Sequence, residues 1–244
     1  MKRVILAFAL GASVVVLAGH SASAEVYQCG TYGSKFDGWI QPYTPPTSER
    51  SEGTSSVLTV HRGSVCDTDT SSSNFVFAWT MISDQRSGVT GYAQSGFFRW
   101  YGSSMYHTTE YKQDTAHTYV RKICLTCGAL IDGETNQYWE QYVTSCSCLR
   151  LNVDVTILDT TPFNPYSTWV FPFRSQYYGE TKYLESDMPG YLSAPTDFRS
   201  MQIQHTSTHT WTNVPCDLLG QNDNTTRWGS GADLTCIHGW IYTK

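Results

Sequence analysis

The chain has 244 residues, of which 40% are hydrophobic, 14% are aromatic and only 15% are charged, and its formal net charge is −5. This length is enough to bury a sizeable core. The net negative charge should repel phosphate backbones and anionic lipid surfaces. No long basic run offsets this repulsion, since the nearest approach to one is the pair Arg121-Lys122. We therefore expect no nucleic acid partner.

Residues 1–24 have the pattern of an export signal peptide. Two basic residues follow Met1, residues 4–19 are predominantly apolar, and Ala22-Ser23-Ala24 is a small-residue cleavage site. Removal of the signal leaves 220 residues with a formal charge of −7, and these contain no second apolar stretch of about 18 residues that could span a membrane. We expect a secreted, extracellular protein with no membrane span after cleavage.

Residues 25–56 are expected to form an N-terminal arm and a linker, ahead of one domain over residues 57–244. The segment 42–56 (PYTPPTSERSEGTSS) has almost no apolar content, which is typical of an extended surface segment. It follows a short piece that holds Cys29.

The rest of the chain is rich in Tyr, Trp, Thr and Ser and has almost no helical periodicity, so β-strands are expected. The clearest strand is 149–157, in which apolar and polar residues alternate. Ser87-Gly88 and Asp132-Gly133 are typical of hairpin turns. Short strands at this spacing predict an all-β sandwich or barrel. The other expected strands are 57–60, 74–82, 92–100, 105–111, 118–125, 138–143, 177–184, 198–205, 208–214 and 234–242.

All eight cysteines follow the signal, and an exported chain favours disulfides over a zinc ribbon at Cys124-x-x-Cys127 and Cys146-x-Cys148. If a hairpin forms around Asp132-Gly133, nested bridges Cys124–Cys148 and Cys127–Cys146 become feasible. Pairs Cys29–Cys66 and Cys216–Cys236 would then remain, although the sequence does not choose among the possible pairings. In a strand, His205 and His209 lie too far apart to share an ion. We expect no metal and no other cofactor.

Possible chemistry rests on acids within aromatic strands, because no serine nucleophile elbow, zinc-protease motif or phosphate-binding loop is present. These acids are Glu110, Glu140 and Glu180. Two carboxyl groups in a partly dry cleft acquire different pKa values, so one can donate a proton while the other activates water. In the alternative interpretation each acid lies on a solvated strand face, paired with a cation such as Arg99 or Lys182.

The segment Gly91-Tyr92-Ala93-Gln94-Ser95-Gly96-Phe97, followed by Tyr101-Gly102, resembles the first glutamate region of the neprosin-domain family, the secreted glutamic peptidases. Tyr178-Gly179-Glu180-Thr181-Lys182-Tyr183, followed by Asp187-Met188-Pro189-Gly190 and Phe198-Arg199-Ser200-Met201-Gln202-Ile203, is similar to its Gly-Glu strand, Met-Gly loop and closing strand.

The resemblance implies an antiparallel β-sandwich of packed sheets with a long cleft, in which Glu180 is the second catalytic glutamate. At the position of the family's first glutamate this chain has Arg99 and Trp100, and no acid lies between Asp84 and Glu110. Arg99 could instead pair with Glu180 and hold it ionised.

Two functions stay open. The first is a binding protein whose aromatic cleft holds an extracellular glycan or an extended peptide without the full pair of catalytic glutamates. Its ligand-binding candidates are Arg99, Trp100, Tyr106, Trp139 and Tyr178, with Trp79 as a further aromatic. The second is a secreted acid-type hydrolase, glutamic peptidase-like or a glycosidase, that uses Glu180 with Glu110 or Glu140 as its partner. A structural coat or adhesion component has no distinguishing residue.

Overall fold

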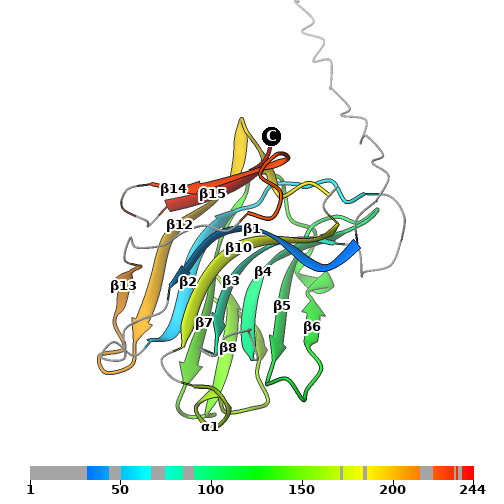
Figure 1. The fold of residues 1–244 in the computed structure, drawn as a ribbon. Helices are drawn as coiled ribbons and strands as arrows, with labels where there is room; N and C mark the ends of the chain where they lie inside the picture. Colours follow the sequence, from blue (N-terminus) through cyan, green and yellow to red (C-terminus); the bar gives the residue numbers. More distant parts are fainter. Residues whose placement is uncertain are drawn as a thin grey trace, which may run out of the picture.

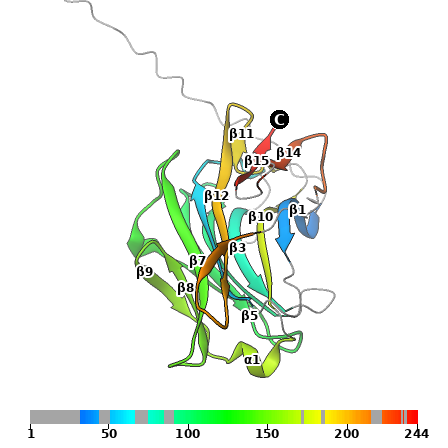
Figure 2. The same ribbon diagram turned by 90° about the vertical axis from the view of Figure 1, so that its left-hand side faces the viewer.

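A computed structural model describes residues 32–43, 51–66, 75–84, 91–170, 173–183, 186–214, 222–233, 235 and 238–244. These residues form two sheets that pack face to face as a sandwich, with strands paired antiparallel almost throughout (Figures 1 and 2). The expected all-β antiparallel sandwich is confirmed. Within the described ranges, no helix has the length and hydropathy needed to cross a membrane.

The first sheet has six strands, and its central strands come from distant parts of the chain. Strand β10 lies between β1 and β3, so residues about 100 positions apart become neighbours (Figure 1). The order across the sheet is β1 (Tyr32–Tyr43), β10 (Arg174–Tyr183), β3 (Phe75–Ser83), β4 (Tyr92–Trp100), β5 (Tyr106–Lys112) and β6 (Val120–Ile123).

The second sheet has nine strands and is built around β2 and β12. Its order is β14 (Trp228–Ala232), β15 (His238–Thr243), β11 (Gly190–Tyr191), β12 (Ala194–His205), β2 (Ser51–Thr59), β7 (Thr135–Val143), β8 (Cys148–Val153) and β9 (Thr156–Thr160), with β13 (Trp211–Asn213) paired to β12. Short helical turns are η1 (Leu125–Cys127) and α1 (Pro165–Thr168).

The main core lies between the two sheets. Ala78, Phe97 and Tyr177 of the six-stranded sheet pack there against residues such as Leu58 and Phe198 of the nine-stranded sheet. Because side chains alternate along a strand, their neighbours in sequence point to the opposite face. We call this opposite side, which is turned away from the nine-stranded sheet, the outer face of the six-stranded sheet.

The outer face of the six-stranded sheet has an aromatic cluster of its own. All nine residues of β3 are buried, which is expected for a strand covered on both sides. The rings of Phe77 and Trp79 stack with centroids 4.1 Å apart, and Phe77 lies 4.5 Å from Phe98. The buried members are Phe75, Phe77, Trp79, Met81, Phe98 and Tyr178.

Two strand assignments need correction. The run 149–157 is not one strand, because β8 ends at Val153 and β9 begins at Thr156. Asp154 has a φ of 49°, and Val155 is 97% exposed, as fits a tight turn. Residues 51–56, expected in the linker, form the buried first part of β2. Thr54 and Ser56 point between the sheets, where Thr54 Oγ1 donates to Tyr177 Oη at 3.0 Å and Ser56 Oγ lies 2.5 Å from Thr80 Oγ1, and hydropathy alone does not indicate this polar part of the interior.

The hairpin expected around Asp132-Gly133 is wrong. Strand β6 pairs with β5 in the six-stranded sheet, whereas β7 pairs with β2 and β8 in the other sheet. The chain therefore crosses between sheets after β6, and Cys124 and Cys148 do not face each other. This crossing rules out the nested disulfides.

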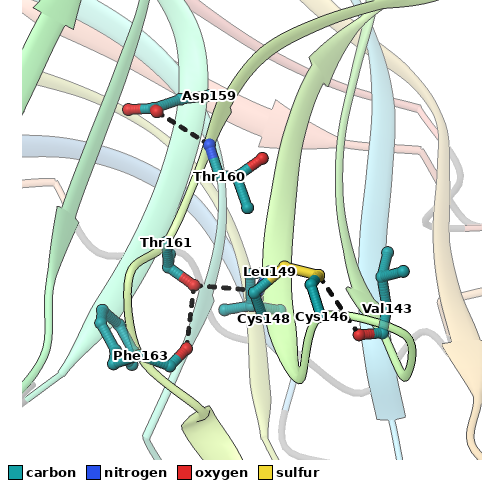
Figure 3. Close-up of a disulfide and its surroundings, with 8 residues drawn as sticks. All are labelled: Val143, Cys146, Cys148, Leu149, Asp159, Thr160, Thr161 and Phe163. Atoms are coloured by element: carbon teal, nitrogen blue, oxygen red, sulfur yellow. Dashed lines mark hydrogen bonds between the residues drawn. A yellow bond between two sulfur atoms is a disulfide. The ribbon is translucent and has the colours of Figure 1, made fainter.

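The disulfides instead close local turns. Cys124 bonds to Cys127 around η1, and Cys146 bonds to Cys148 in the turn between β7 and β8 (Figure 3). Neither bridge ties one sheet to the other. Cys66 is also disulfide-bonded, and no described cysteine is free.

Several expectations concern residues outside those that the structure describes. They are the signal over residues 1–24, the Ser87-Gly88 turn, and Cys29, Cys216 and Cys236. His205 and His209 lie at the turn that leads from β12 to β13, and no group of metal-binding side chains occurs among the described residues.

Candidate functional site

A row of polar side chains crosses the outer face of the six-stranded sheet. Strand pairing places Gln176 of β10 opposite Met81 of β3, Met81 opposite Gln94 of β4, and Gln94 opposite Glu110 of β5. Arg121 of β6 is the next residue in this row. Two strand spacings separate Gln94 from Gln176, so their Cα atoms lie about 10 Å apart.

Gln94 is held by hydrogen bonds at both ends of its carboxamide. The Tyr178 hydroxyl donates to Gln94 Oε1, and Gln94 Nε2 donates to Glu110 Oε1 at 3.3 Å. Gln94 is only 2% exposed. Because Nε2 carries two hydrogens, Glu110 accepts only one of the two hydrogen bonds that this amide can donate.

Besides Gln94, three further donor groups engage Glu110. Tyr92 donates to Glu110 Oε1 at 2.5 Å, and Arg121 Nε and Nη2 each lie 2.6 Å from Oε2. The Arg121 guanidinium also lies over the Phe77 ring, 4.6 Å from its centroid. This carboxylate is thus already neutralised by an arginine that stays charged at all ordinary pH values.

Tyr92 connects the row to Glu180. Burial raises the pKa of Tyr92 well above its usual value, and the charges of Glu110 and Glu180 raise it further. The hydroxyl therefore remains a donor across the ordinary pH range. Its interaction with both acids indicates that Glu110 and Glu180 lie within electrostatic reach of one hydroxyl group.

Glu180 faces the same side of the sheet but belongs to another row. It pairs with Phe77 of β3 and Asp37 of β1, four residues along β10 from Gln176. It is 9% exposed. The β10 position in the same row as Gln94, on the far side of Met81, is therefore taken by Gln176 rather than by Glu180.

Two buried donors on this face have no hydrogen-bond partner. They are Trp79 Nε1, in a side chain with no exposed surface, and Gln176 Nε2, in a side chain that is 3% exposed. Trp79 pairs with Tyr178, which is two residues from Gln176 on β10. An unsatisfied buried donor costs about 1–3 kcal/mol, so two of them together favour a site completed by a ligand acceptor.

The structure brings together five of the residues singled out from the sequence. Trp100 and Tyr106 stack with centroids 5.6 Å apart at the end of the face that carries Phe98. Both are partly exposed. With Glu110, Tyr178 and Glu180 they lie on the outer face of the six-stranded sheet.

Arg99 and Trp139 lie elsewhere. Arg99 Nη1 donates to the Gly63 carbonyl at 2.6 Å and Nε donates to the Ser103 carbonyl at 3.1 Å. Burial and the neighbouring Arg62 lower the pKa of Arg99. The suggested pairing of Arg99 with Glu180 is therefore wrong. Trp139 belongs to β7 of the nine-stranded sheet, so no single cleft holds both Trp139 and Tyr178.

Glu140 lies between the sheets. Its side chain has no exposed surface, Ser95 Oγ donates to Oε1, and Oε2 has no partner. Burial raises the pKa of Glu140 well above its usual value, so the carboxyl group is neutral well into the range where exposed glutamates ionise. Glu140 therefore cannot act on a substrate beside Glu180.

Gln94 and Gln176 were not singled out as site residues from the sequence. Gln94 lies within the stretch that resembles the first glutamate region. It is two residues from Tyr92 on β4, and this spacing predicts that the two side chains lie on the same face of the sheet. Nothing local identifies Gln176 as its neighbour, because the two residues lie on strands that are distant in sequence.

Comparison with known proteins identifies the fold. No protein-family model matches the chain, and no curated protein matches it. Scytalido-glutamic peptidase with a transition state analog inhibitor matches with a TM-score of 0.55 at 13% identity, over 86% of this chain and 99% of that one. The same peptidase with a peptide-based transition state analog gives a TM-score of 0.51 at 11% identity, over 86% and 98%. The chain thus has a glutamic peptidase-like β-sandwich fold.

Proposed function

We propose that the outer face of the six-stranded sheet binds an extended peptide segment and does not hydrolyse it. The observation that carries this proposal is the pair of carboxamides, Gln94 and Gln176, at the centre of the face. A carboxamide offers both a donor and an acceptor, as does each peptide unit of a ligand. The orphaned donors of Gln176 and Trp79 match two ligand carbonyl oxygens.

The aromatic cluster supports the same ligand class. Trp100 and Tyr106 are partly exposed and stacked, which suits contact with ligand side chains while the amides contact the main chain. Glu110 is occupied by Arg121 and Tyr92, so it is poorly placed to exchange protons with a substrate. A binding role without a complete pair of catalytic glutamates follows.

Isothermal titration with a mixture of end-blocked octapeptides tests this role. Gln94→Ala and Gln176→Ala should each weaken binding about tenfold, the equivalent of about 1.4 kcal/mol for a lost hydrogen bond. Tyr191→Ala, at an exposed aromatic on β11, is the matched control and should bind as the parent does. The proposal would be refuted if the double variant, which carries both Gln94→Ala and Gln176→Ala, bound the octapeptides with the same affinity as the parent protein.

A second candidate is an acid-type hydrolase with Glu180 and Glu110 as its acids. It is favoured by the position of both acids on one face, where the charges of both carboxylates raise the pKa of Tyr92. The test is hydrolysis of internally quenched peptides between pH 2 and pH 7. Turnover by the parent that disappears in Glu180→Gln would establish the hydrolase and overturn the purely binding role. Absence of turnover in the parent supports the binding role.

We further propose that the protein is exported by the segment 1–24 and acts outside the cell, with a sandwich domain that includes β1 and all of β2 as well as the later strands. The disulfides at Cys124–Cys127 and Cys146–Cys148 are consistent with an oxidising compartment. Neprosin-domain proteins are the proposed kin, on the strength of the region that contains Glu180. Mass spectrometry of the secreted protein tests export, since it should begin at Glu25.

A further inference from the structure

A groove lies on the other side of the molecule, on the face of the nine-stranded sheet that is turned away from the six-stranded sheet. It has a volume of about 270 Å³ and is lined by Gln137, Trp139, Gln141, Asp154 and Trp211. We call it the tryptophan groove. Tyr138 and Glu140, which alternate with these β7 residues, are completely buried on the opposite side of the strand.

Both indoles of the groove are held in place. Trp139 Nε1 donates to the Asp154 carbonyl at 3.0 Å, which fixes the ring beside the turn between β8 and β9. Trp211 lies over Gly53 of β2, because a Cβ atom at Gly53 would stand only 3.1 Å from Trp211 Cη2. Both tryptophans remain partly exposed. A glycine under the ring thus lets Trp211 rest on the sheet surface.

The groove also has hydrogen-bonding groups that the protein does not use. Among the described residues, neither the Gln141 side-chain amide nor the indole N–H of Trp211 forms a hydrogen bond. Asp154 Oδ1 accepts the Gln137 backbone N–H at 2.9 Å, which leaves Oδ2 for a ligand.

The chemistry of the lining selects a class of ligand. Indole rings offer flat apolar surfaces, and the amides and the carboxylate offer donors and acceptors to hydroxyl groups. The lining itself contains no Lys or Arg, although Arg150 pairs with Gln141 at its edge, and the negative protein repels nucleic acid. Strands β2 and β7 are paired on both sides, so a peptide cannot add to the sheet there.

We propose that the tryptophan groove binds a neutral glycan chain, with sugar rings stacked on Trp139 and Trp211. The groove volume of about 270 Å³ is slightly below the roughly 300–1,000 Å³ of small-molecule sites, which suits contact with a short stretch of a longer chain. This site does not depend on the peptide site of the other sheet. The protein would hold a polysaccharide on one face and a peptide segment on the other.

Titration calorimetry and amide NMR with cellohexaose, mannohexaose and chitohexaose test the proposal. At least one hexaose should bind, and Trp139→Ala and Trp211→Ala should each weaken its binding at least tenfold. Tyr191→Ala should leave the affinity unchanged. Gln141→Ala, which removes only a surface carboxamide, should weaken binding several-fold and covers the case in which a tryptophan variant fails to fold.

Three results would overturn the proposal. They are the absence of heat and of shift changes with all three hexaoses at 10 mM, binding that survives in the Trp139→Ala, Trp211→Ala double variant, and a Gln141→Ala variant that binds as the parent does. Loss of octapeptide binding in Gln94→Ala with retained hexaose binding supports two separate sites.

Discussion

Glu140 makes stability depend on pH in a direction opposite to that of most glutamates. Its carboxyl group is completely buried between the sheets, one oxygen accepts the Ser95 hydroxyl, and the other has no partner. Burial raises its pKa in the folded state well above the reference value of 4.5. The folded protein therefore keeps a proton that the unfolded chain loses near pH 4.5.

The sign and size of the effect follow from this difference. The stabilising contribution is fully present below pH 4.5 and is lost as pH rises towards the pKa of the folded state. In that window the free energy of unfolding falls with pH, and the slope approaches about 1.4 kcal/mol per pH unit once the unfolded group is ionised. Glu140→Gln is neutral at every pH and removes the slope.

Urea unfolding of the parent and of Glu140→Gln at several pH values from 4 to 7 measures the effect. Subtracting the two curves cancels the other titrating groups, so the variant should gain stability relative to the parent as pH rises. Glu134→Gln, which replaces a partly exposed acid just before β7, should give a curve nearly parallel to that of the parent. If the curve for Glu140→Gln is also parallel, the carboxyl group is not buried as described.

Three other substitutions test the packing. Gly96→Ala places a Cβ atom 1.9 Å from the Ala78 carbonyl oxygen, so the free energy of unfolding in urea should fall by about 3 kcal/mol or more. A loss below about 1 kcal/mol would contradict the pairing of β3 with β4. Arg121→Gln leaves Glu110 buried without its cation, and calorimetry should register a loss of about 3 kcal/mol; an unchanged melting temperature would mean that the ion pair does not form. The double substitution Cys124→Ala, Cys127→Ala opens a very short disulfide loop, so chemical denaturation should show a loss of no more than about 2 kcal/mol in the free energy of unfolding. Global unfolding of this variant would disagree with a local bridge.

Strand identity could be predicted wherever one stretch of sequence decides it. The strand 92–100 is found with its expected bounds, and β3 and β5 differ from expectation by one residue at each end. Alternation along these strands also predicts which side chains share a face. Tyr92 and Gln94 on β4 and Tyr178 and Glu180 on β10 follow this rule.

Local pattern could not reveal the pairing partners. The turn at Asp132-Gly133 has the residues of a hairpin, yet β6 and β7 join different sheets. The start of β2 resembles a linker in sequence because it is polar. Its hydroxyl groups find hydrogen-bond partners or become buried only when the two sheets assemble. Thr54 Oγ1, for example, donates to Tyr177 Oη at 3.0 Å across 123 residues.

The sequence by itself determined that this chain forms β-strands with aromatic faces and bonded cysteines, because residue preference and two-residue alternation act over a few neighbouring positions. Only the tertiary structure decided that β10 lies between β1 and β3, which places Gln176 in the same row as Gln94, with Met81 between them, and leaves Glu180 in another row. It also separated Trp139 from Tyr178 onto opposite sides of the sandwich. Hydrogen bonding between strands fixes these neighbours, and each such bond depends on residues far apart in the chain.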